Sequence, residues 1–209
     1  DINKKRAHAI KILSRFLYME QDKMDLRLAQ FNSGKLHNAI PRDGIIVFAV
    51  PANEKETVRV DWNIFTANVE EEFHVTDTAM EFGLESTDAE TVIAKECSTR
   101  FIRCMQAIDN GVFAMCQDEA LAWMVETSNN VASVITSENE INIVASQRSN
   151  VMSNLENETN TIKAVFELAG AEVKMSDGYP AWKMNPDSKL TKVAVESYKK
   201  LFGKEPIVK

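Results

Sequence analysis

The sequence predicts an α+β fold, in which an antiparallel-rich sheet carries helices on one face. Apolar side chains recur at helical spacings over residues 1–20 and 54–74, as they do on helices with one buried face. Residues 25–31 alternate polar and apolar side chains, and residues 45–50 are apolar throughout, as in strands. The order helix, strand, strand, helix, strand then occurs a second time, which indicates a doubled architecture.

The first helix is predicted over residues 1–20, because its apolar side chains fall on one stripe. These side chains are Ile2, Ala9, Ile10, Leu13, Phe16 and Leu17. Lysine and arginine side chains mostly cover the opposite side, and Asp1 suits the positive start of the helix dipole. The strands 25–31 and 45–50 follow, and turn-forming residues lie between them. We therefore expect these two strands to pair in the antiparallel direction.

The loop between these strands contains the segment Leu-His-Asn-Ala-Ile-Pro at residues 36–41. Pro41 fixes its own φ angle and disfavours the α conformation for Ile40, so we expect the segment to be held extended. Asn38 would then project from a stiff loop. Considered by itself, the simplest interpretation is that its side chain bonds to the local backbone.

Three further elements complete the first half and begin the second. Asn53 can cap a helix over residues 54–74. Residues 79–85 alternate as a short strand, and residues 89–108 form the next predicted helix. The apolar stripe of the helix over residues 54–74 contains Val58, Trp62, Phe65, Val69 and Phe73.

The second half repeats this order of elements. Residues 121–136 predict one long strand or two shorter ones, and residues 141–146 its antiparallel partner. A helix over residues 151–169 ends at Gly170 and is followed by a strand over residues 171–175.

The last helix is predicted over residues 189–202, between the capping residue Ser188 and the terminating Gly203. Residues 206–209 resemble the beginning of a strand.

Together the elements suggest two split βαβ units of ferredoxin-like kind. They occupy about residues 1–86 and 87–187, and a returning helix covers about residues 188–203. The residues of the two units do not visibly repeat, so the duplication concerns the architecture alone.

Composition argues against several classes of function. The chain has 209 residues, with 24 basic and 31 acidic residues and a formal net charge of −7, which disfavours binding to nucleic-acid phosphates. No apolar run approaches the roughly 18 residues of a membrane span. The cysteines Cys97, Cys104 and Cys116 lack metal-knuckle spacing and are typical of reduced thiols in the cytosol.

No metal or nucleophile motif is recognisable. His8, His37 and His74 each lack a partner at ligand spacing, so a lone surface or core histidine is the simpler interpretation for each. The acidic run at residues 70–72 is more simply a solvated helix face.

Two polar features remain near the end of the predicted strand 141–146. Arg148 can offer a bidentate fork to a carboxylate, although a plain surface arginine would look the same. The run Glu-Thr-Ser-Asn-Asn at residues 126–130 can be a bulge or the polar lining of a pocket. Because the turn at residues 137–139 folds the two strands together, we expect this run to lie near Arg148.

The sequence resembles the aminoacyl-histidine dipeptidases, also called Xaa-His or cytosol non-specific dipeptidases, in four blocks that occur in family order. The blocks are residues 25–31 with 36–42, 125–131, 148–149, and 170–172 with 179–182. The resemblance implies a carnosinase-like metallopeptidase, whose zinc-binding catalytic domain carries an inserted lid, or dimerisation, domain. This chain would be the lid without the catalytic domain. Zinc or another divalent metal, its ligands and the catalytic glutamate would then lie outside residues 1–209.

Residue by residue, the resemblance implies two substrate-binding groups. Asn38 matches the lid asparagine near the substrate, and Arg148 matches the arginine that binds the C-terminal carboxylate of the dipeptide. The residues expected to line the pocket beside them are Thr127, Ser128, Asn130 and Tyr179. The chain departs from the family at Asn129, where leucine is usual, and at Ala181, where glycine is common, which puts the shape of the pocket in doubt.

The sequence therefore predicts a substrate-positioning lid and dimerisation domain of a cytoplasmic, metal-dependent dipeptidase that hydrolyses Xaa-His and related dipeptides. The expected partners are the dipeptide, the catalytic domain of the same enzyme and, in a homodimer, a second copy. No catalytic or metal-binding residue is expected within the chain, which should be inactive alone. The two halves would supply Asn38 and Arg148 to one pocket. The alternative is a free-standing α+β interaction module that dimerises through a sheet edge or helix face.

Overall fold

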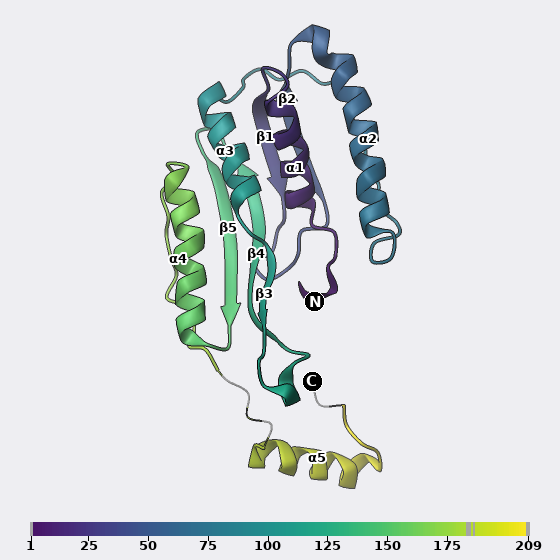
Figure 1. The fold of residues 1–209 in the computed structure, drawn as a ribbon, viewed down its shortest axis with the longest axis vertical. Coiled ribbons are helices and arrows are strands. Elements are labelled where there is room, and N and C mark those ends of the chain that lie inside the picture. Colours follow the sequence, from purple (N-terminus) through teal and green to yellow (C-terminus); the bar gives the residue numbers. More distant parts are fainter. Residues whose placement is uncertain (1, 183–184, 186, 208–209) are drawn as a thin grey trace.

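The computed structural model describes residues 2–182, 185 and 187–207. Across these residues, five α-helices accompany one antiparallel sheet of five strands, which confirms the predicted α+β class (Figure 1). The strands are β1 (Arg27–Ser33), β2 (Gly44–Ala49), β3 (Gly111–Met115), β4 (Val125–Thr136) and β5 (Ile141–Ser149). The helices are α1 (Ala9–Gln21), α2 (Lys55–Phe73), α3 (Lys95–Ala107), α4 (Met152–Leu168) and α5 (Lys189–Phe202).

The long strand β4 lies at the centre of the sheet. One edge of β4 pairs with β3 near its beginning and with β1 near its end, and the other edge pairs with β5. Strand β2 pairs with β1 in the antiparallel direction, as the sequence predicted. Because both ends of β4 have neighbours, the strand can carry buried polar residues without leaving its backbone unpaired.

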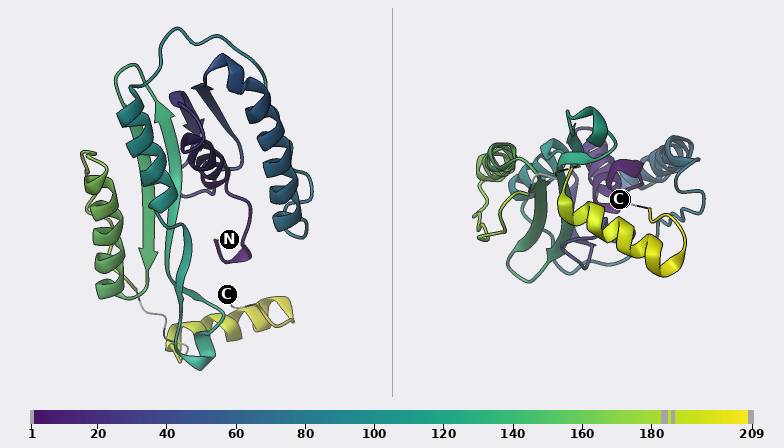
Figure 2. Two further views of the ribbon diagram at one scale, coloured as in Figure 1. Left: turned by 45° about the horizontal axis from the view of Figure 1, so that its top comes forward. Right: turned by 90° about the horizontal axis from the view of Figure 1, so that it is seen from below.

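The helices α1, α3 and α4 lie over one face of the sheet, and α2 lies beside α1 (Figure 2). The apolar stripes of the helices and the covered face of the strands form the main core between these two layers. The main core includes Ile10, Leu17, Leu28, Phe31, Ile102, Met105, Val131, Val134, Ile162 and Phe166.

A second apolar cluster, which we call the α1–α2 cluster, joins the first two helices. The ring of Phe16 is fully buried, and its centroid lies 4.8 Å from that of Trp62 and 5.3 Å from that of Phe65. The side chains that pack around these rings include Ile12, Val58 and Val69. The stripe predicted on residues 54–74 is therefore the face that packs, which explains why this helix was recognisable from the sequence.

The first helix is shorter than the sequence predicted. Residues 2–4 form a single 3-10 turn, and α1 begins at Ala9. Between them, Lys5 has a φ angle of 49°, which lies in the left-handed region and interrupts a right-handed helix. Residues 3–8 carry no large apolar side chain, so nothing on this stretch draws it onto the sheet as a helix.

Two predicted strands are not formed. Residues 79–85 and 171–175 make no strand pairing. Met80 and Phe82 instead pack against the α1–α2 cluster, and Val173 packs against the main core. The alternation of polar and apolar side chains in these segments arises because one side packs against neighbouring elements. The segments do not pair with any strand of the sheet. The single sheet consequently does not show the two ferredoxin-like halves that were expected.

Several element boundaries also differ from the prediction. Helix α3 begins at Lys95, because the preceding segment runs beside β1, where the Ile93 N–H donates to the Leu28 carbonyl at 2.7 Å. Strand β3 was not predicted. Residues 206–207 are not in a strand, and residues 208–209 lie outside the described part of the chain.

Two glycines end helices as predicted, but the two side chains that were predicted to cap helix starts do not do so. Gly170 and Gly203 have φ angles of 79° and 65°, the left-handed conformation that ends a helix. The amide of Asn53 donates to the Glu54 carboxylate instead of capping α2, and Ser188 makes no side-chain capping bond to α5.

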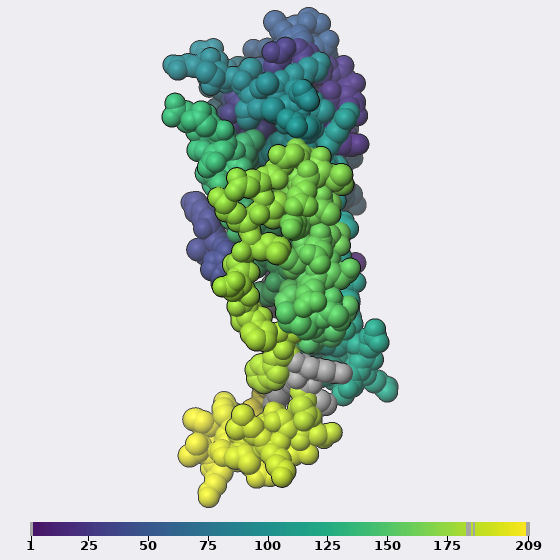
Figure 3. Space-filling view, turned by 90° about the vertical axis from the view of Figure 1, so that its left-hand side faces the viewer, coloured from purple at the N-terminus to yellow at the C-terminus, as the bar shows by residue number. Residues whose placement is uncertain are grey.

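Helix α5 lies apart from the sheet and its covering helices (Figures 1 and 3). None of its residues is buried, and the side chains of Leu190, Leu201 and Phe202 are exposed. This helix therefore adds nothing to either apolar cluster. Among the described residues, no helix combines the length and the apolar character needed to cross a membrane.

Candidate functional site

A cleft of about 1430 Å³ opens at the end of the sheet where α1 begins. Its walls include residues 2–4 and 6–7, the first half of α1, the loop that joins β1 to β2, and the segment 76–82. Strands β4 and β5, with the two residues before β4, supply the remaining wall. Four of the six predicted site residues line this cleft, and these are Asn38, Ser128, Asn130 and Arg148.

Four polar residues of β4 and β5 that line the cleft come from one face of the sheet. Ser128 lies directly opposite Arg148, and Asn130 lies opposite Ser146. Paired residues in an antiparallel ladder point to the same side, and so do residues two apart on one strand, so the four side chains share a face. This register confirms the predicted proximity of the polar run at residues 126–130 to Arg148. Residues 127–130 pair regularly with β5, whereas the pairing of the run with β3 shifts register at Glu126, so the predicted bulge is present on that edge alone.

Asn38 lies on a turn, not on the extended segment that the sequence predicted. The Ala39 N–H donates to the Leu36 carbonyl at 3.3 Å, which closes the turn around residues 37–38. The Asn38 side chain is exposed and makes no hydrogen bond to any described residue, so the expected bond to local backbone is absent. Its amide is therefore available to the cleft.

Arg148 is likewise exposed at the end of β5. Its guanidinium forms no ion pair or hydrogen bond within the described part of the chain. An arginine that lines a cleft without an internal partner can accept a carboxylate or phosphate oxygen pair.

Thr127 and Tyr179 are not brought to the cleft. The Thr127 side chain is buried on the opposite side of β4, where its hydroxyl shares a 2.9 Å hydrogen bond with that of Ser149. Tyr179 is 75% exposed in the segment after α4. Thr127 is the neighbour of Ser128 on β4. Adjacent residues of a strand point to opposite faces of the sheet, so Thr127 points away from the cleft.

His8, for which a lone surface or core histidine was the simpler interpretation, is buried at the start of α1. The Lys11 N–H donates to His8 Nδ1 at 3.4 Å, and His8 Nε2 lies 3.3 Å from Asn130 Oδ1. The Asn130 amide donates to the Ala39 carbonyl at 2.9 Å. These contacts connect α1 to the loop that carries Asn38. One sequence signal could have indicated that the helix begins near His8. Residues 3–8 carry no large apolar side chain, so the apolar stripe of the helix starts only after them.

Burial favours the neutral form of His8. The pKa of His8 falls from 6.5 to about 4, chiefly because burial disfavours the imidazolium, and the Lys11 charge lowers it further. The hydrogen bond that His8 makes to the Asn130 side-chain oxygen opposes this shift. The histidine is therefore neutral at physiological pH, with one ring nitrogen as acceptor and the other as donor.

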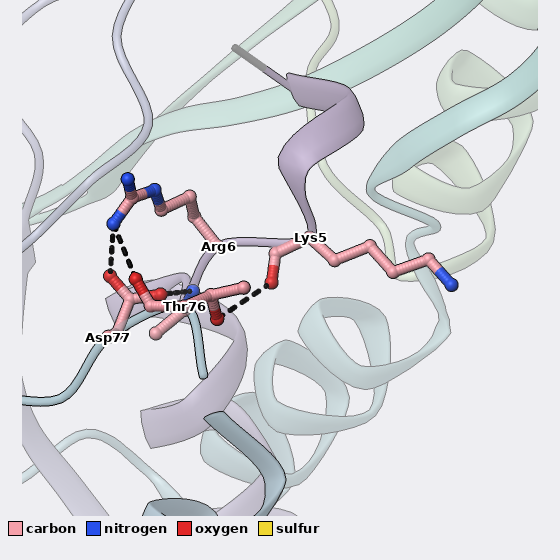
Figure 4. A network of polar contacts seen from close by, with 5 residues as sticks. Lys5, Arg6, Thr76 and Asp77 are labelled. Carbon is pink, nitrogen blue, oxygen red and sulfur yellow. Dashed lines mark hydrogen bonds and ion pairs between the residues drawn. The ribbon is translucent and has the colours of Figure 1, made fainter. Parts of the chain in front are cut away.

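A polar clasp between residues 5–7 and 76–77 closes one wall of the cleft (Figure 4). The Ala7 N–H donates to Asp77 Oδ2 at 2.9 Å, and the Arg6 guanidinium donates to the Thr76 carbonyl and to Asp77. Burial opposes ionisation of Asp77, but these hydrogen bonds and the Arg6 charge hold its pKa below the ordinary value. The clasp joins the residues that precede α1 to the segment that follows α2.

Metal-binding groups are not assembled in the described residues. No cluster of three or more histidine, cysteine, aspartate or glutamate side chains there could hold a metal ion.

Comparisons with known proteins place these features in context. The chain is 32% identical over 201 residues to the cytosol non-specific dipeptidase of Escherichia coli (strain K12), covering 95% of this chain and 41% of that protein. The crystal structure of aminoacylhistidine dipeptidase from Vibrio alginolyticus superposes with a TM-score of 0.87 at 32% identity, covering 99% of this chain and 42% of that one. No family model matches the chain.

The chain is thus homologous to dipeptidases. In particular, it is homologous to the aminoacylhistidine and cytosol non-specific dipeptidases, and it spans about two-fifths of their length. This confirms the resemblance drawn from the four sequence blocks.

Proposed function

We propose that the chain is the substrate-positioning lid and dimerisation domain of a metal-dependent, cytoplasmic dipeptidase that hydrolyses Xaa-His and related dipeptides. The observation that supports this most directly is that Asn38 and Arg148, both exposed and without side-chain partners among the described residues, line one cleft. The homology to dipeptidases makes a dipeptide the natural ligand to consider for that cleft.

Arg148 is the proposed recognition group for the C-terminal carboxylate of the dipeptide. The planar guanidinium matches a carboxylate in a bidentate arrangement, which fixes both the position and the orientation of the peptide end. Ser128 lies opposite Arg148 in the ladder, so its hydroxyl is placed to support the same carboxylate.

Asn38 is the proposed contact to the peptide group itself. Its amide offers both a donor and an acceptor, which a peptide N–H and carbonyl can satisfy together. In this proposal one chain supplies both groups, Asn38 from the β1–β2 loop and Arg148 from the end of β5.

The lid would position the dipeptide and exclude water, while the bond is broken by groups outside the described residues. Zinc or another divalent metal, which this class of enzyme implies, finds no ligand cluster among the described residues, and we assign it no step here. The proposed partners are the catalytic domain of the same enzyme and, in a homodimer, a second copy. We further propose that α5 leads the chain back to the catalytic domain.

The test compares a dipeptide with its C-terminal amide in the natural polypeptide that carries this sequence. Replacing Arg148 with alanine should raise the KM for the dipeptide by about 10- to 100-fold, the value of a charge-assisted hydrogen-bond pair. The amide has no carboxylate, so its KM should hardly change. R103A, which removes an exposed arginine from α3, is the matched control. Equal effects of R148A on both substrates would contradict the proposal.

A second test uses the 209-residue chain alone. We expect the purified chain to hydrolyse no Xaa-His dipeptide, even with added zinc. Robust metal-dependent turnover by this chain would refute the proposal that it only positions the dipeptide while other groups break the bond. If the natural polypeptide has no dipeptidase activity at all, the alternative of a free-standing interaction module gains support.

A further inference from the structure

The loop that carries Asn38 is held against α1 by two tethers. One is made by backbone alone, since the Ala9 N–H donates to the Pro41 carbonyl at 3.1 Å. The other runs through side chains, from His8 to Asn130 and then to the Ala39 carbonyl. The second tether ends one residue from Asn38, so it controls the direction in which the turn presents that side chain.

The hydrogen atoms of the second tether can be assigned from chemistry. The Ala39 carbonyl can accept but cannot donate, so the Asn130 nitrogen must face it and the Asn130 oxygen must face His8. His8 Nδ1 already accepts from the Lys11 N–H, so the proton of the neutral ring lies on Nε2 and is donated to Asn130. The His8 Nε2–H and one N–H of the Asn130 amide therefore each meet an acceptor.

We infer that His8 is a positioning residue that acts through Asn130 to fix the Asn38 turn in the cleft. The inference rests on the proposed function for what Asn38 then contacts, but the positioning itself is a property of the free chain. Burial of His8, whose side chain is 6% exposed, keeps water from competing for either ring nitrogen.

A rival explanation is that His8 merely caps α1. The variant His8→Asn separates the two roles, because asparagine is a good N-cap and its side-chain oxygen can still accept from the Lys11 N–H. Asparagine is too short to span the distance to Asn130. The variant should therefore keep the helix start and lose the tether.

The experiment is amide hydrogen exchange of the full polypeptide, observed at Ala39 in the loop and at Val134 in the core. H8N and N130A should each speed exchange at Ala39 by about three- to tenfold, the value of one lost hydrogen bond. The double variant should be no faster than the faster single one, since both changes cut the same tether. Exchange at Val134 should not change. H74N, which alters an exposed histidine after α2, is the control.

Three results would overturn the inference. These are wild-type exchange at Ala39 in H8N, equal acceleration at Ala39 and Val134, or additive effects in the double variant. In the natural polypeptide, H8N should also lower kcat/KM for a dipeptide while adding little to N38A. Absence of dipeptide hydrolysis in the wild type would defeat the proposed function, and the exchange result would still decide the role of His8.

Discussion

The α1–α2 cluster and the cleft are held together by different kinds of interaction. In the cluster, two helix stripes meet, and Phe16 packs between Trp62 and Phe65. In the cleft, polar groups 70, 91 and 122 positions apart in the sequence are joined by single hydrogen bonds. The cluster is built from apolar area, which is non-directional, whereas the cleft is built from directional contacts.

This difference separates stability from ligand binding. Substitution of Phe16, Trp62 or Phe65, cluster residues that do not line the cleft, should lower the stability without a specific effect on the cleft. Substitutions among the unpartnered cleft residues should alter binding at nearly constant stability. Substitutions that remove the polar contacts around the cleft should have an intermediate effect on stability.

The largest effect is expected for Phe16→Ala. The ring is fully buried in the α1–α2 cluster, so its removal loses the transfer free energy and leaves a cavity. We expect the free energy of unfolding to fall by about 3–5 kcal/mol, measured by urea denaturation. A loss below about 1 kcal/mol would show that this cluster is not a principal source of stability.

The next effect concerns pH and His8. Its pKa is about 4 in the folded protein and 6.5 ordinarily, so the unfolded state takes up the proton first as the pH falls. The stability due to neutral His8 should be complete above pH 6.5 and should be lost as the pH falls from 6.5 toward 4. The loss should approach about 3 kcal/mol. Urea unfolding of the wild type and H8N across this range measures it, and parallel pH profiles would refute the assignment.

A smaller effect is expected for Asp77→Ala. The substitution leaves the Ala7 N–H without its acceptor and opens the clasp on one wall of the cleft. We expect a loss of about 1–2 kcal/mol in the free energy of unfolding. Asp88→Ala, at an exposed aspartate outside the clasp, should change it by less than about 0.5 kcal/mol. Equal effects of the two variants would show that the clasp does not stabilise the fold.

The smallest effect on stability is expected for Arg148→Ala. The guanidinium has no partner among the described residues, so its loss should change the free energy of unfolding by less than about 0.5 kcal/mol. Differential scanning calorimetry can check this value. A loss above about 1 kcal/mol would mean that Arg148 serves the fold, and it would weaken the proposed role in binding a carboxylate.

The elements that could be predicted from the sequence are those whose cause is local in the chain. Helix α2 and the strand pair β1–β2 were predicted because periodicity along the chain reports which face is buried. The start of α1 was not, because the residues before it make their polar contacts with Thr76 and Asp77, far along the chain. The predicted strands at residues 79–85 and 171–175 failed since alternation also arises in segments that pack without pairing.

The cleft shows which parts of a site can be predicted. The polar run at residues 126–130 was correctly placed near Arg148, because the turn after β4 folds the two strands together. The exact partners were not predictable, since a register shift between Val131 and Ser133 decides that Ser128 lies opposite Arg148. Thr127 was assigned to the same pocket, although it alternates with these residues and points away. His8 was passed over because its partner Asn130 comes from a distant strand, which local patterns do not reveal.

The most direct test of the central claim is a crystal structure of the natural polypeptide with a non-hydrolysable dipeptide analogue. The account predicts that the C-terminal carboxylate of the analogue lies on the Arg148 guanidinium and that the Asn38 amide contacts its backbone. An analogue bound elsewhere in the polypeptide, with Arg148 and Asn38 both left in solvent, would contradict it.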